Sequence, residues 1–503
     1  MASISTAIGM DRIATISGYR ISKGKFNETS PNLPMNIAIL GEANTDKQGG
    51  LITDKIELTS SQEAGDLFGF GSPIHQIMRI LRPVGSDGVG GIPTFVFPLA
   101  TDLSSTQSTE EFTVTGTVSK NSKHTIYING RSGYDYQTFD VLLESGDTAS
   151  QVAAKYVEVI NNVLSSPVTA SDDTGGVFTI SSKSKGISSN FNARISVNGN
   201  SSGLSYATTT SSAGAGVPDI SDALSKFGND WHTIVINPYE SKLSDLETFN
   251  GTPDDADGRY VPYEFKPFVS LFGSTESTKE DISSITDSSD RINQVTNMLC
   301  PAPNSESSNL EAAANMAYLF SITMQNTPQL DVTNQGYPDI SVPDNGNIGD
   351  MSSYPNRDYL VKKGASTVLF EKGEYEVQDF VTTYHPSGES PLQYSYGRNL
   401  IIDWNIKYGY DVLAKINVRN RALVKDDQET NVDKSVSPKQ WKAILFDYFD
   451  NLAERGFIID PEFSKSSLSV QISPTNPNRF ETFFRYKRTG LARIESTSVE
   501  AGF

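Results

Sequence analysis

The amino-acid sequence predicts a multidomain protein of mixed α/β class, with an α/β core, an inserted β-rich domain, a helix-rich C-terminal lobe and extended N- and C-terminal arms. Three observations support this prediction. Short apolar runs alternate with segments of helical periodicity in two separate parts of the chain. A stretch rich in Ser, Thr, Gly and Asn separates those parts, and long amphipathic segments follow near the C-terminus. The chain has 503 residues, whereas one domain usually has about 100–200, so several domains are expected.

Changes in composition set the expected domain boundaries. They predict an N-terminal arm over residues 1–30, a first core part over 31–103, an insert over 104–210, a second core part over 211–390, a helical lobe over 391–480 and a C-terminal arm over 481–503. Because the same α/β pattern occurs before and after the insert, we expect both parts to belong to one core.

Short runs of mainly apolar residues predict the buried strands of the core. They occupy residues 37–40, 94–97, 232–236 and 268–272. Helix starts are marked by capping residues. Ser60 with Glu63 forms a capping-box pattern, Ser72-Pro73 places proline at a first helical position, and Asn309 is expected to cap an Ala-rich helix that ends near Met324. Residues 326–358, rich in Pro, Asn, Asp and Gly, are expected to be irregular.

The insert shows strand-like alternation with one helix. Strands are expected at residues 112–116, 124–128, 177–180 and 194–197, and Thr148 with Gln151 predicts the helix start. The Ser/Gly/Ala-rich run 200–216 is expected to be the linker through which the chain leaves the insert.

The C-terminal lobe carries two long amphipathic patterns. Apolar residues recur at helical spacing over 400–413, and a second helix begins at Ser437-Pro438, where Gln440 completes a capping box. Residues 483–488 read as extended, with Phe484 and Tyr486 on one face and Arg485 and Lys487 on the other.

Charge and composition exclude several classes of protein. The formal net charge is −19 and the pI is about 4.7, which argues against binding of nucleic acid over the whole surface. Cys300 is the only cysteine, which fits a reducing cytoplasm. No apolar run approaches the length of about 20 residues that a membrane span needs, and the N-terminal residues lack the pattern of a signal peptide. We therefore expect no membrane insertion.

Residues that could carry catalysis or bind a cofactor or metal are scarce. The four histidines, His75, His124, His232 and His385, show no paired metal spacing, and the glycine-rich segments lack a nucleotide-binding fingerprint. Asp254, Asp255 and Asp257 resemble part of a calcium loop whose closing Glu is absent. We predict no catalytic residue, no cofactor and no metal.

A basic strip near the C-terminus is the clearest candidate site. Residues 483–494 contain Arg485, Lys487, Arg488 and Arg493 and no acidic residue. Two interpretations stay open: basic residues that protect an edge strand from aggregation, or a strand that pairs with another subunit and faces an acidic partner.

The order of several short motifs resembles that of the Mu-type contractile tail sheath proteins of tailed bacteriophages. The matching segments are residues 35–41, Leu67-Phe68-Gly69 followed by Gly71-Ser72, residues 95–99, Ile128-Asn129-Gly130, residues 145–148, residues 182–186, Gly216-Val217-Pro218-Asp219, residues 234–239 and Asn476-Pro477-Asn478-Arg479. They span nearly the whole chain, and their order carries the resemblance.

This resemblance implies a structural subunit of the virion tail, assembled in the bacterial host cytoplasm. Subunits would form stacked hexameric rings around a tail tube and contract without nucleotide to drive the tube through the host envelope. The implied partners are further copies of the chain, the tail tube protein, and baseplate and tail terminator proteins, without direct contact with nucleic acid. The arms would add strands to neighbouring subunits through Ile13, Ile16, Tyr19, Phe484, Tyr486, Leu491 and Ile494. The basic residues Arg485, Lys487, Arg488 and Arg493 would face an acidic tube.

Other functions remain open from the sequence. The chain could form the sheath of a headless contractile particle or another self-assembling virion or surface-layer protein. A carbohydrate-binding protein or hydrolase is a third alternative, for which Asp254 and Asp257 are the only candidate acidic pair.

Overall fold

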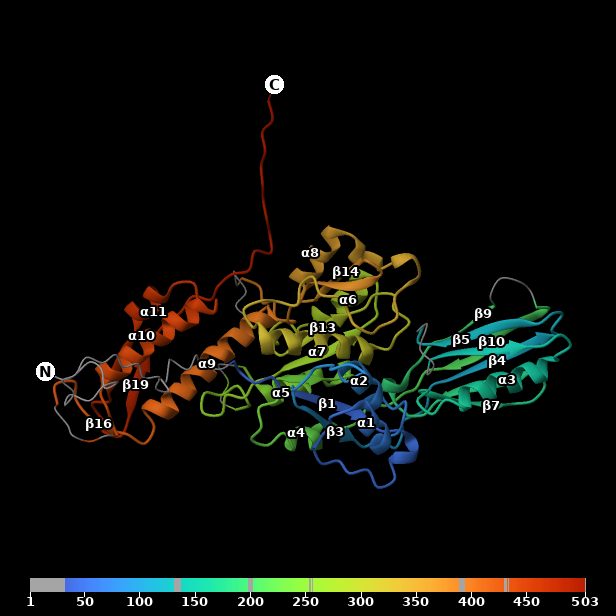
Figure 1. Cartoon of the computed structure of the whole chain (residues 1–503), viewed down its shortest axis with the longest axis horizontal. Helices are drawn as coiled ribbons and strands as arrows, with labels where there is room; N and C mark the ends of the chain where they lie inside the picture. Colours follow the sequence, from blue (N-terminus) through green and yellow to red (C-terminus); the bar gives the residue numbers. More distant parts are fainter. Residues whose placement is uncertain are drawn as a thin grey trace, which may run out of the picture. The chain divides into compact units, whose positions relative to one another are not determined.

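The computed structural model describes residues 32–130, 137–197, 202–252, 255, 257–388, 394–428, 432 and 434–502. The chain divides into two compact units. The core unit contains Leu33–Asn405 and the chain from Arg488 onward, and the C-terminal unit contains Ile406–Lys487. Figure 1 shows the elements of both units, coloured along the sequence. The predicted mixed α/β, multidomain class is confirmed.

A six-stranded sheet forms the centre of the core unit. Its order is β13-β12-β11-β1-β3-β2. Strand β1 pairs in parallel with β3 on one side and with β11 on the other, so Ile37 lies opposite both Thr94 and Ile234. The strand bounds are β1 Ile37–Glu42, β2 Ile56–Glu57, β3 Thr94–Leu99, β11 Ile234–Ile236, β12 Val269–Ser274 and β13 Asn297–Pro301. Strands from before and after the insert therefore build one sheet.

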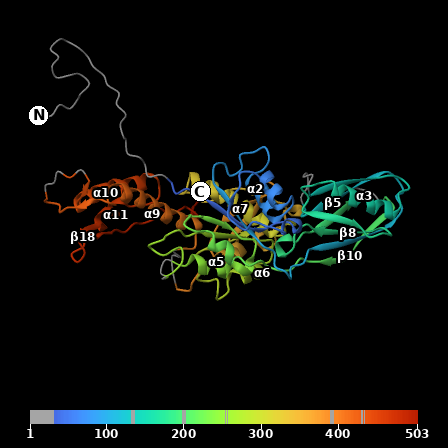
Figure 2. The same cartoon turned by 90° about the horizontal axis from the view of Figure 1, so that it is seen from below.

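Helices cover both faces of this sheet. Figure 2 shows α2 and α7 on one side and α5 on the other. Alternate residues of β1 point to opposite faces, and Ala38 and Leu40 pack against Leu224 and Leu246 of α4 and α5. The bounds are α1 Ser61–Phe68, α2 Pro73–Leu81, α4 Ser221–Ser225, α5 Leu243–Asn250 and α7 Asn309–Asn326, with short 3-10 turns at η1 Thr45–Lys47 and η3 Glu240–Lys242.

Local capping chemistry sets the helix starts as predicted, with one exception. The hydroxyls of Ser60 and Ser72 accept from the third backbone N–H of their helices. The predicted cap at Asn309 is wrong by one residue, because Ser308 is the N-cap of α7 and its N–H donates to the Glu311 carboxylate at 3.1 Å. Ser and Asn are both favourable N-cap residues, so the residue types alone do not decide between positions 308 and 309.

The insert folds into two antiparallel sheets and one helix. The sheet orders are β10-β4-β8-β7 and β6-β5-β9. The rings of Phe112, Phe178 and Tyr156 stack in its core, with centroids 5.4 and 5.1 Å apart. The bounds are β4 Thr109–Gly116, β5 Ser122–Ile128, β6 Thr138–Leu143, α3 Ala149–Asn161, β7 Val168–Asp172, β8 Val177–Ser182, η2 Ile187–Ser189, β9 Ala193–Val197 and β10 Leu204–Ser212.

The prediction of a linker over 200–216 is wrong for residues 204–212. Strand β10 occupies most of that run and pairs antiparallel with β4. Hydroxyl groups support the pairing across the strands, since Thr115 and Ser205 lie 2.6 Å apart and Thr113 and Thr209 lie 3.1 Å apart. Ser and Thr are therefore strand residues in this run, and their hydroxyl groups hydrogen-bond to side chains of the neighbouring strand.

The rest of the core unit contains two further helices and a hairpin. Helices α6 Lys279–Thr286 and α8 Tyr354–Lys362 and the hairpin of β14 Thr367–Glu371 with β15 Glu374–Asp379 lie here. The stretch 326–358 has two short 3-10 turns, η4 Asp344–Gly346 and η5 Gly349–Ser352, before α8 begins.

The C-terminal unit is built on two long helices, as predicted. Helix α9, Gly397–Asn417, leads into it, and α10, Pro438–Glu454, begins at the capping box of Ser437 and Gln440. Its apolar face, with Trp441, Leu445, Phe449 and Leu452, is buried. The other elements are β16 Ala422–Leu423, β17 Ser435–Val436, α11 Pro461–Ser467, β18 Ser469–Ile472 and β19 Phe480–Phe483.

Candidate assembly surfaces

The predicted arm residues fall into three groups. Ile13, Ile16 and Tyr19 lie outside the described residues. Phe484 and Tyr486 belong to the C-terminal unit, where the ring of Phe484 lies 5.1 Å from Phe449 and 6.0 Å from Tyr410. Leu491 is partly buried and Ile494 is 84% exposed in the core unit. The residues from Ile494 to Gly502 are all exposed and have neither helix nor strand. The exposed part of the C-terminal arm therefore begins at Ile494.

The predicted alternation at 484–487 is present. Phe484 and Tyr486 are partly buried, whereas Arg485 and Lys487 are exposed. The guanidinium of Arg485 lies 5.7 Å from the centre of the Phe483 ring. The Lys487 ammonium pairs with Asp460 at 2.8 Å and lies 4.3 Å from the Phe463 ring. Two of the four predicted basic residues thus present their charge to solvent on the C-terminal unit.

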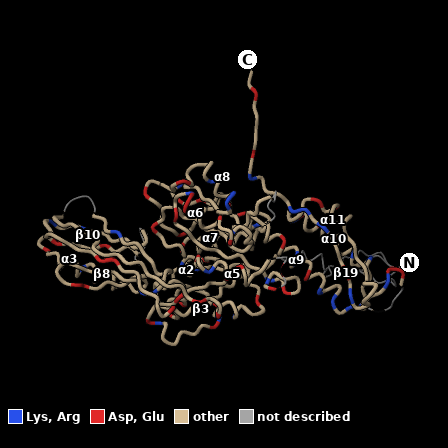
Figure 3. The backbone as a smooth tube through the Cα atoms, turned by 180° about the vertical axis from the view of Figure 1, so that it is seen from behind, with Lys and Arg blue, Asp and Glu red and all other residues tan. Residues whose placement is uncertain are grey.

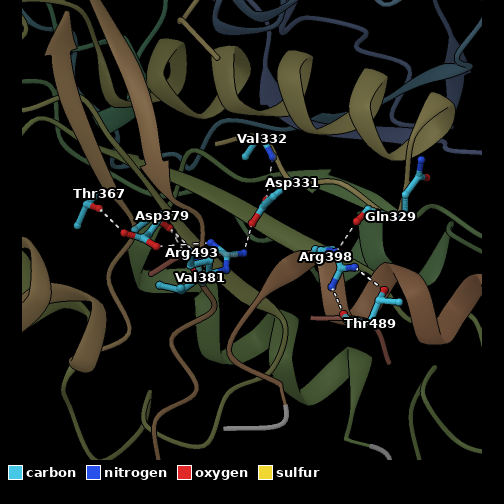
Figure 4. Close-up of polar contacts among 10 residues, drawn as sticks. Gln329, Asp331, Val332, Thr367, Asp379, Val381, Arg398, Thr489 and Arg493 are labelled. Atoms are coloured by element: carbon cyan, nitrogen blue, oxygen red, sulfur yellow. Dashed lines mark hydrogen bonds and ion pairs between the residues drawn. The ribbon is translucent and has the colours of Figure 1, made fainter. Parts of the chain in front are cut away.

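The other two basic residues bind carboxylates of the core unit. Arg488 donates from Nε to Oδ1 of Asp403 at 2.7 Å, and a second guanidinium nitrogen contacts Oδ2. Arg493 pairs with Asp331 and, at 3.5 Å, with Asp379. Figure 4 shows the Arg493 side chain between these two carboxylates. Their role toward a tube stays a prediction, but these side chains already have partners within the chain.

The surroundings of Arg493 are largely buried. Its guanidinium lies 3.9 Å from the centre of the Tyr396 ring. Burial raises the pKa of the Asp379 carboxyl, and the charge of Arg493 opposes that rise. Arg398 of α9 lies nearby and donates to the carbonyls of Gln329 and Thr489 at 2.6 and 2.7 Å (Figure 4).

A second basic segment lies at the end of α9. We call residues 415–425 the basic turn; they contain Lys415, Arg419, Arg421 and Lys425 and no acidic residue. Lys415, Arg419 and Lys425 are exposed. The sequence signal for this segment is four cations within 11 residues that include no acidic residue, and the sequence analysis did not identify it.

Charge differs strongly between the two units. Residues 406–487 carry 13 Lys and Arg against 11 Asp and Glu, whereas the rest of the chain carries 28 against 49. Figure 3 shows how the charged residues are distributed along the backbone. The C-terminal unit is therefore slightly basic in a strongly acidic protein, which favours an acidic partner for that unit.

Strands β18 and β19 form a sheet with two free edges. They pair antiparallel with each other, from Ser469 opposite Phe483 to Ile472 opposite Phe480, and neither has a second ladder partner within the described ranges. Strand β18 packs against α10, which supports the sheet while its edges carry unpaired backbone groups. An additional strand from another chain would extend this ladder and stabilise it.

The residues considered for catalysis do not converge. His75 and His232 are buried, and burial lowers their pKa to about 3 and about 4. Cys300 is buried, which raises the pKa of its thiol well above the ordinary value. In the part of the chain that the structure describes, no group of three or more His, Cys, Asp or Glu residues could hold a metal ion. Asp254, the first member of the candidate acidic pair, lies outside that part.

Helices in the described ranges are also too short or too polar to cross a membrane. The structure is thus that of a multidomain α/β protein whose candidate surfaces are exposed charge, free strand edges and an exposed terminal segment. These are the features of a protein that associates with other chains.

Comparison with known proteins confirms the resemblance to Mu-type tail sheath proteins. The chain is 22% identical over 506 aligned residues to the Mu-like prophage FluMu tail sheath protein of Haemophilus influenzae, and the alignment covers 98% of this chain and 96% of that protein. The crystal structure of the sheath tail protein of Desulfitobacterium hafniense is 11% identical, with a TM-score of 0.44 over 94% of this chain and 100% of that one. No protein-family model matches the chain.

Proposed function

We propose that this chain is a structural subunit of a contractile phage tail sheath. The observation that carries the proposal is the similarity to a Mu-like tail sheath protein over 98% of the chain. Subunits polymerise as stacked hexameric rings around a tail tube, and the sheath contracts to drive the tube through the host envelope. The sheath is part of the virion and is assembled in the cytoplasm of the bacterial host, with baseplate and tail terminator proteins at its ends.

The C-terminal arm provides the link between subunits. Residues 494–502 are exposed and extended, and Ile494 and Val499 are 84% and 83% exposed. In the assembly they add a strand to the free edge of the β18–β19 sheet of another copy, which satisfies backbone groups on both sides. The arm also carries Glu495 and Glu500, which can form exposed ion pairs with cations of the neighbouring copy. Each exposed ion pair contributes only about 0–1 kcal/mol, so backbone pairing supplies the main attraction.

The tail tube is the proposed acidic partner of the C-terminal unit. Arg485 and Lys487 are exposed there, and the basic turn adds Lys415, Arg419 and Lys425. Each exposed ion pair with the tube would be weak and screened by salt. Many such contacts together can hold the sheath on the tube, yet they can separate together during contraction.

Electron microscopy of the purified chain with its tube protein tests the proposal. We expect tubes whose lumen holds the inner tube; flat sheets, closed shells or an unassembled protein would contradict it. Arg485→Glu with Lys487→Glu should reduce tube-templated assembly and its dependence on salt. The matched control is Lys120→Glu with Lys362→Glu, which changes the net charge equally at exposed sites of the core unit. An equal effect of both double variants would contradict a tube-facing role for the strip.

A further inference from the structure

The last residue of the C-terminal segment that contacts the core is Arg493, and exposure is continuous from Ile494 onward. Arg488, Thr489 and Arg493 all make polar contacts with the core unit. From Ile494 to Gly502 every residue is exposed. We infer that Arg398, Arg488 and Arg493 form a clip that fixes this segment to the core up to residue 493. The clip thereby sets the point at which the exposed arm leaves the protein.

The contacts of the clip come from three separate elements. Asp403 and Arg398 lie on α9, Asp379 ends β15, and Asp331 lies in the loop after α7. Arg398 holds Thr489 by both its carbonyl, at 2.7 Å, and its hydroxyl, at 2.9 Å. Because the segment is held by side chains from several elements, it cannot leave the core by a small movement of one of them.

The carboxylates of the clip are themselves held in place. The side chain of Asp331 is only 1% exposed, and its Oδ1 accepts from the N–H of Val332 at 2.8 Å. Asp379 also accepts from the hydroxyl of Thr367 at 3.4 Å. Arg493 therefore meets two fixed acceptors and a tyrosine ring, as Figure 4 shows for the carboxylates. Removing Arg493 would leave Asp331 buried with an unpaired charge, which is strongly unfavourable.

The clip has a mechanical consequence that rests on the proposed function. If residues 494–502 pair with a neighbouring subunit, tension on that strand reaches Arg493 first. The clip then transmits this tension to β15 and α9, so that residues 488–493 stay bound to the core. The rigid contact at one end and the exposed strand at the other allow the core to turn during contraction while the link persists.

Limited proteolysis of the full-length chain tests the clip without assembly. Trypsin must take the arginine side chain into its own specificity pocket, so cleavage after Arg488 or Arg493 requires the clip to open. A glutamate-specific protease should cut rapidly after Glu495 and Glu500, which are exposed. We expect rapid cleavage at both glutamates and protection at both arginines, measured by mass spectrometry. Cleavage after Arg493 as fast as after Glu495 would contradict the clip.

Variants of the carboxylates that accept from Arg493 provide a second test of the clip. Asp331→Asn with Asp379→Asn should raise cleavage after Arg493 at least about tenfold, because charge-assisted hydrogen bonds are lost. Asp358→Asn, at an exposed ion pair with Lys362, is the matched control and should leave this rate unchanged. If the double variant does not fold, Arg493→Lys keeps the trypsin site and a positive charge but loses the forked contact, and the same rise is expected. Unchanged protection in folded variants would overturn the inference.

Assembly separates this inference from the proposed function. If the wild-type chain forms no tubes, the proposed function fails, whereas the proteolysis result still decides the clip. If the wild-type chain assembles and the Asp331→Asn, Asp379→Asn variant forms equally long and equally durable tubes under flow, the mechanical role of the clip is refuted.

Discussion

At the scale of single residues, His232 lies in a pocket of aromatic side chains. The imidazole ring lies 5.0–5.3 Å from the rings of Phe95, Phe97 and Phe227. Neither ring nitrogen has a hydrogen-bond partner among the residues described. Burial, with smaller contributions from Lys55 and Arg259, lowers the pKa to about 4. The folded state therefore disfavours the charged imidazolium.

We predict that acid weakens the fold through His232. An unfolded histidine binds a proton near pH 6.5, so between pH 6.5 and 4 the unfolded state holds more protons, and stability falls as pH falls. The expected loss from this residue is about 2–3 kcal/mol between pH 7 and pH 4.5. Urea unfolding at both pH values measures it. His232→Leu should reduce the difference by a similar amount, and an unchanged difference would contradict the assignment.

The roles of single residues could be predicted only where their partners are near in the sequence. The sequence identified Arg488 and Arg493 as unusual, but their carboxylate partners Asp403 and Asp331 lie 85 and 162 positions away. No local pattern connects such residues. The alternation of Phe484 and Arg485 was predictable because it depends on strand periodicity alone.

At the scale of elements, a buried carboxylate joins the insert to the central sheet. Glu42, the last residue of β1, is fully buried, and its Oε2 accepts from Ser188 of the insert at 2.9 Å and from Tyr239 at 3.2 Å. Gly71 allows a close approach of the backbones at the same junction, since a Cβ there would lie 2.2 Å from the carbonyl oxygen of Ser166. The insert thus packs on the end of the sheet where α/β proteins commonly bind ligands.

We predict that a neutral side chain at residue 42 preserves this junction. Burial raises the pKa of Glu42, so the fold disfavours the carboxylate, and stability falls as pH rises above the ordinary range of Glu. Glu42→Gln should leave the free energy of unfolding at pH 8 unchanged or higher. Glu42→Ala should lower it by about 1–3 kcal/mol, because Ser188 and Tyr239 lose their acceptor.

Urea unfolding of these variants measures the effect, with exposed Glu371→Gln as the matched control. A large loss in Glu42→Gln would show that the charge itself stabilises the junction. The same junction sets where the insert, residues 104–210, can be cut out of the chain. The N–H of Thr106 donates to the carbonyl oxygen of Ala215 at 2.9 Å. A deletion of the insert should therefore keep both of these residues and should carry Glu42→Gln.

Helices and strands were predictable where residues close in the sequence determine where they begin. The capping boxes at Thr148 and Ser437 depend on residues three positions apart, and both helices begin there. Strand β10 was missed because its Ser- and Thr-rich sequence resembles a linker. Its pairing with β4, about 90 residues away, is a tertiary contact that composition cannot show.

At the scale of the whole molecule, the order of the strands shows how the chain is organised. Strand β1 pairs with β3 before the insert and with β11 after it, so the two predicted core parts share one sheet. The boundary of the C-terminal unit lies inside α9, at Ile406, although residue 391 was the expected start of the lobe. A continuous helix hides such a boundary in the sequence, because its periodicity does not change there. The exact limits of the domains stay predictions.

Truncation of the C-terminal arm tests whether this arm links copies of the chain. The C-terminal arm was expected over residues 481–503, but Phe484, Arg488 and Arg493 contact the folded units, so the cut belongs after Arg493. The chain that ends at Arg493 should keep the circular dichroism spectrum and melting temperature of the full chain. A control in which a Gly/Ser segment of equal length replaces residues 494–502 separates length from strand-forming sequence.

Electron microscopy of the three proteins with the tube protein gives the result. We expect tubes from the full chain and none from the truncated or Gly/Ser proteins, although both are folded. Long, regular tubes from the truncated protein would contradict a linking role for residues 494–502.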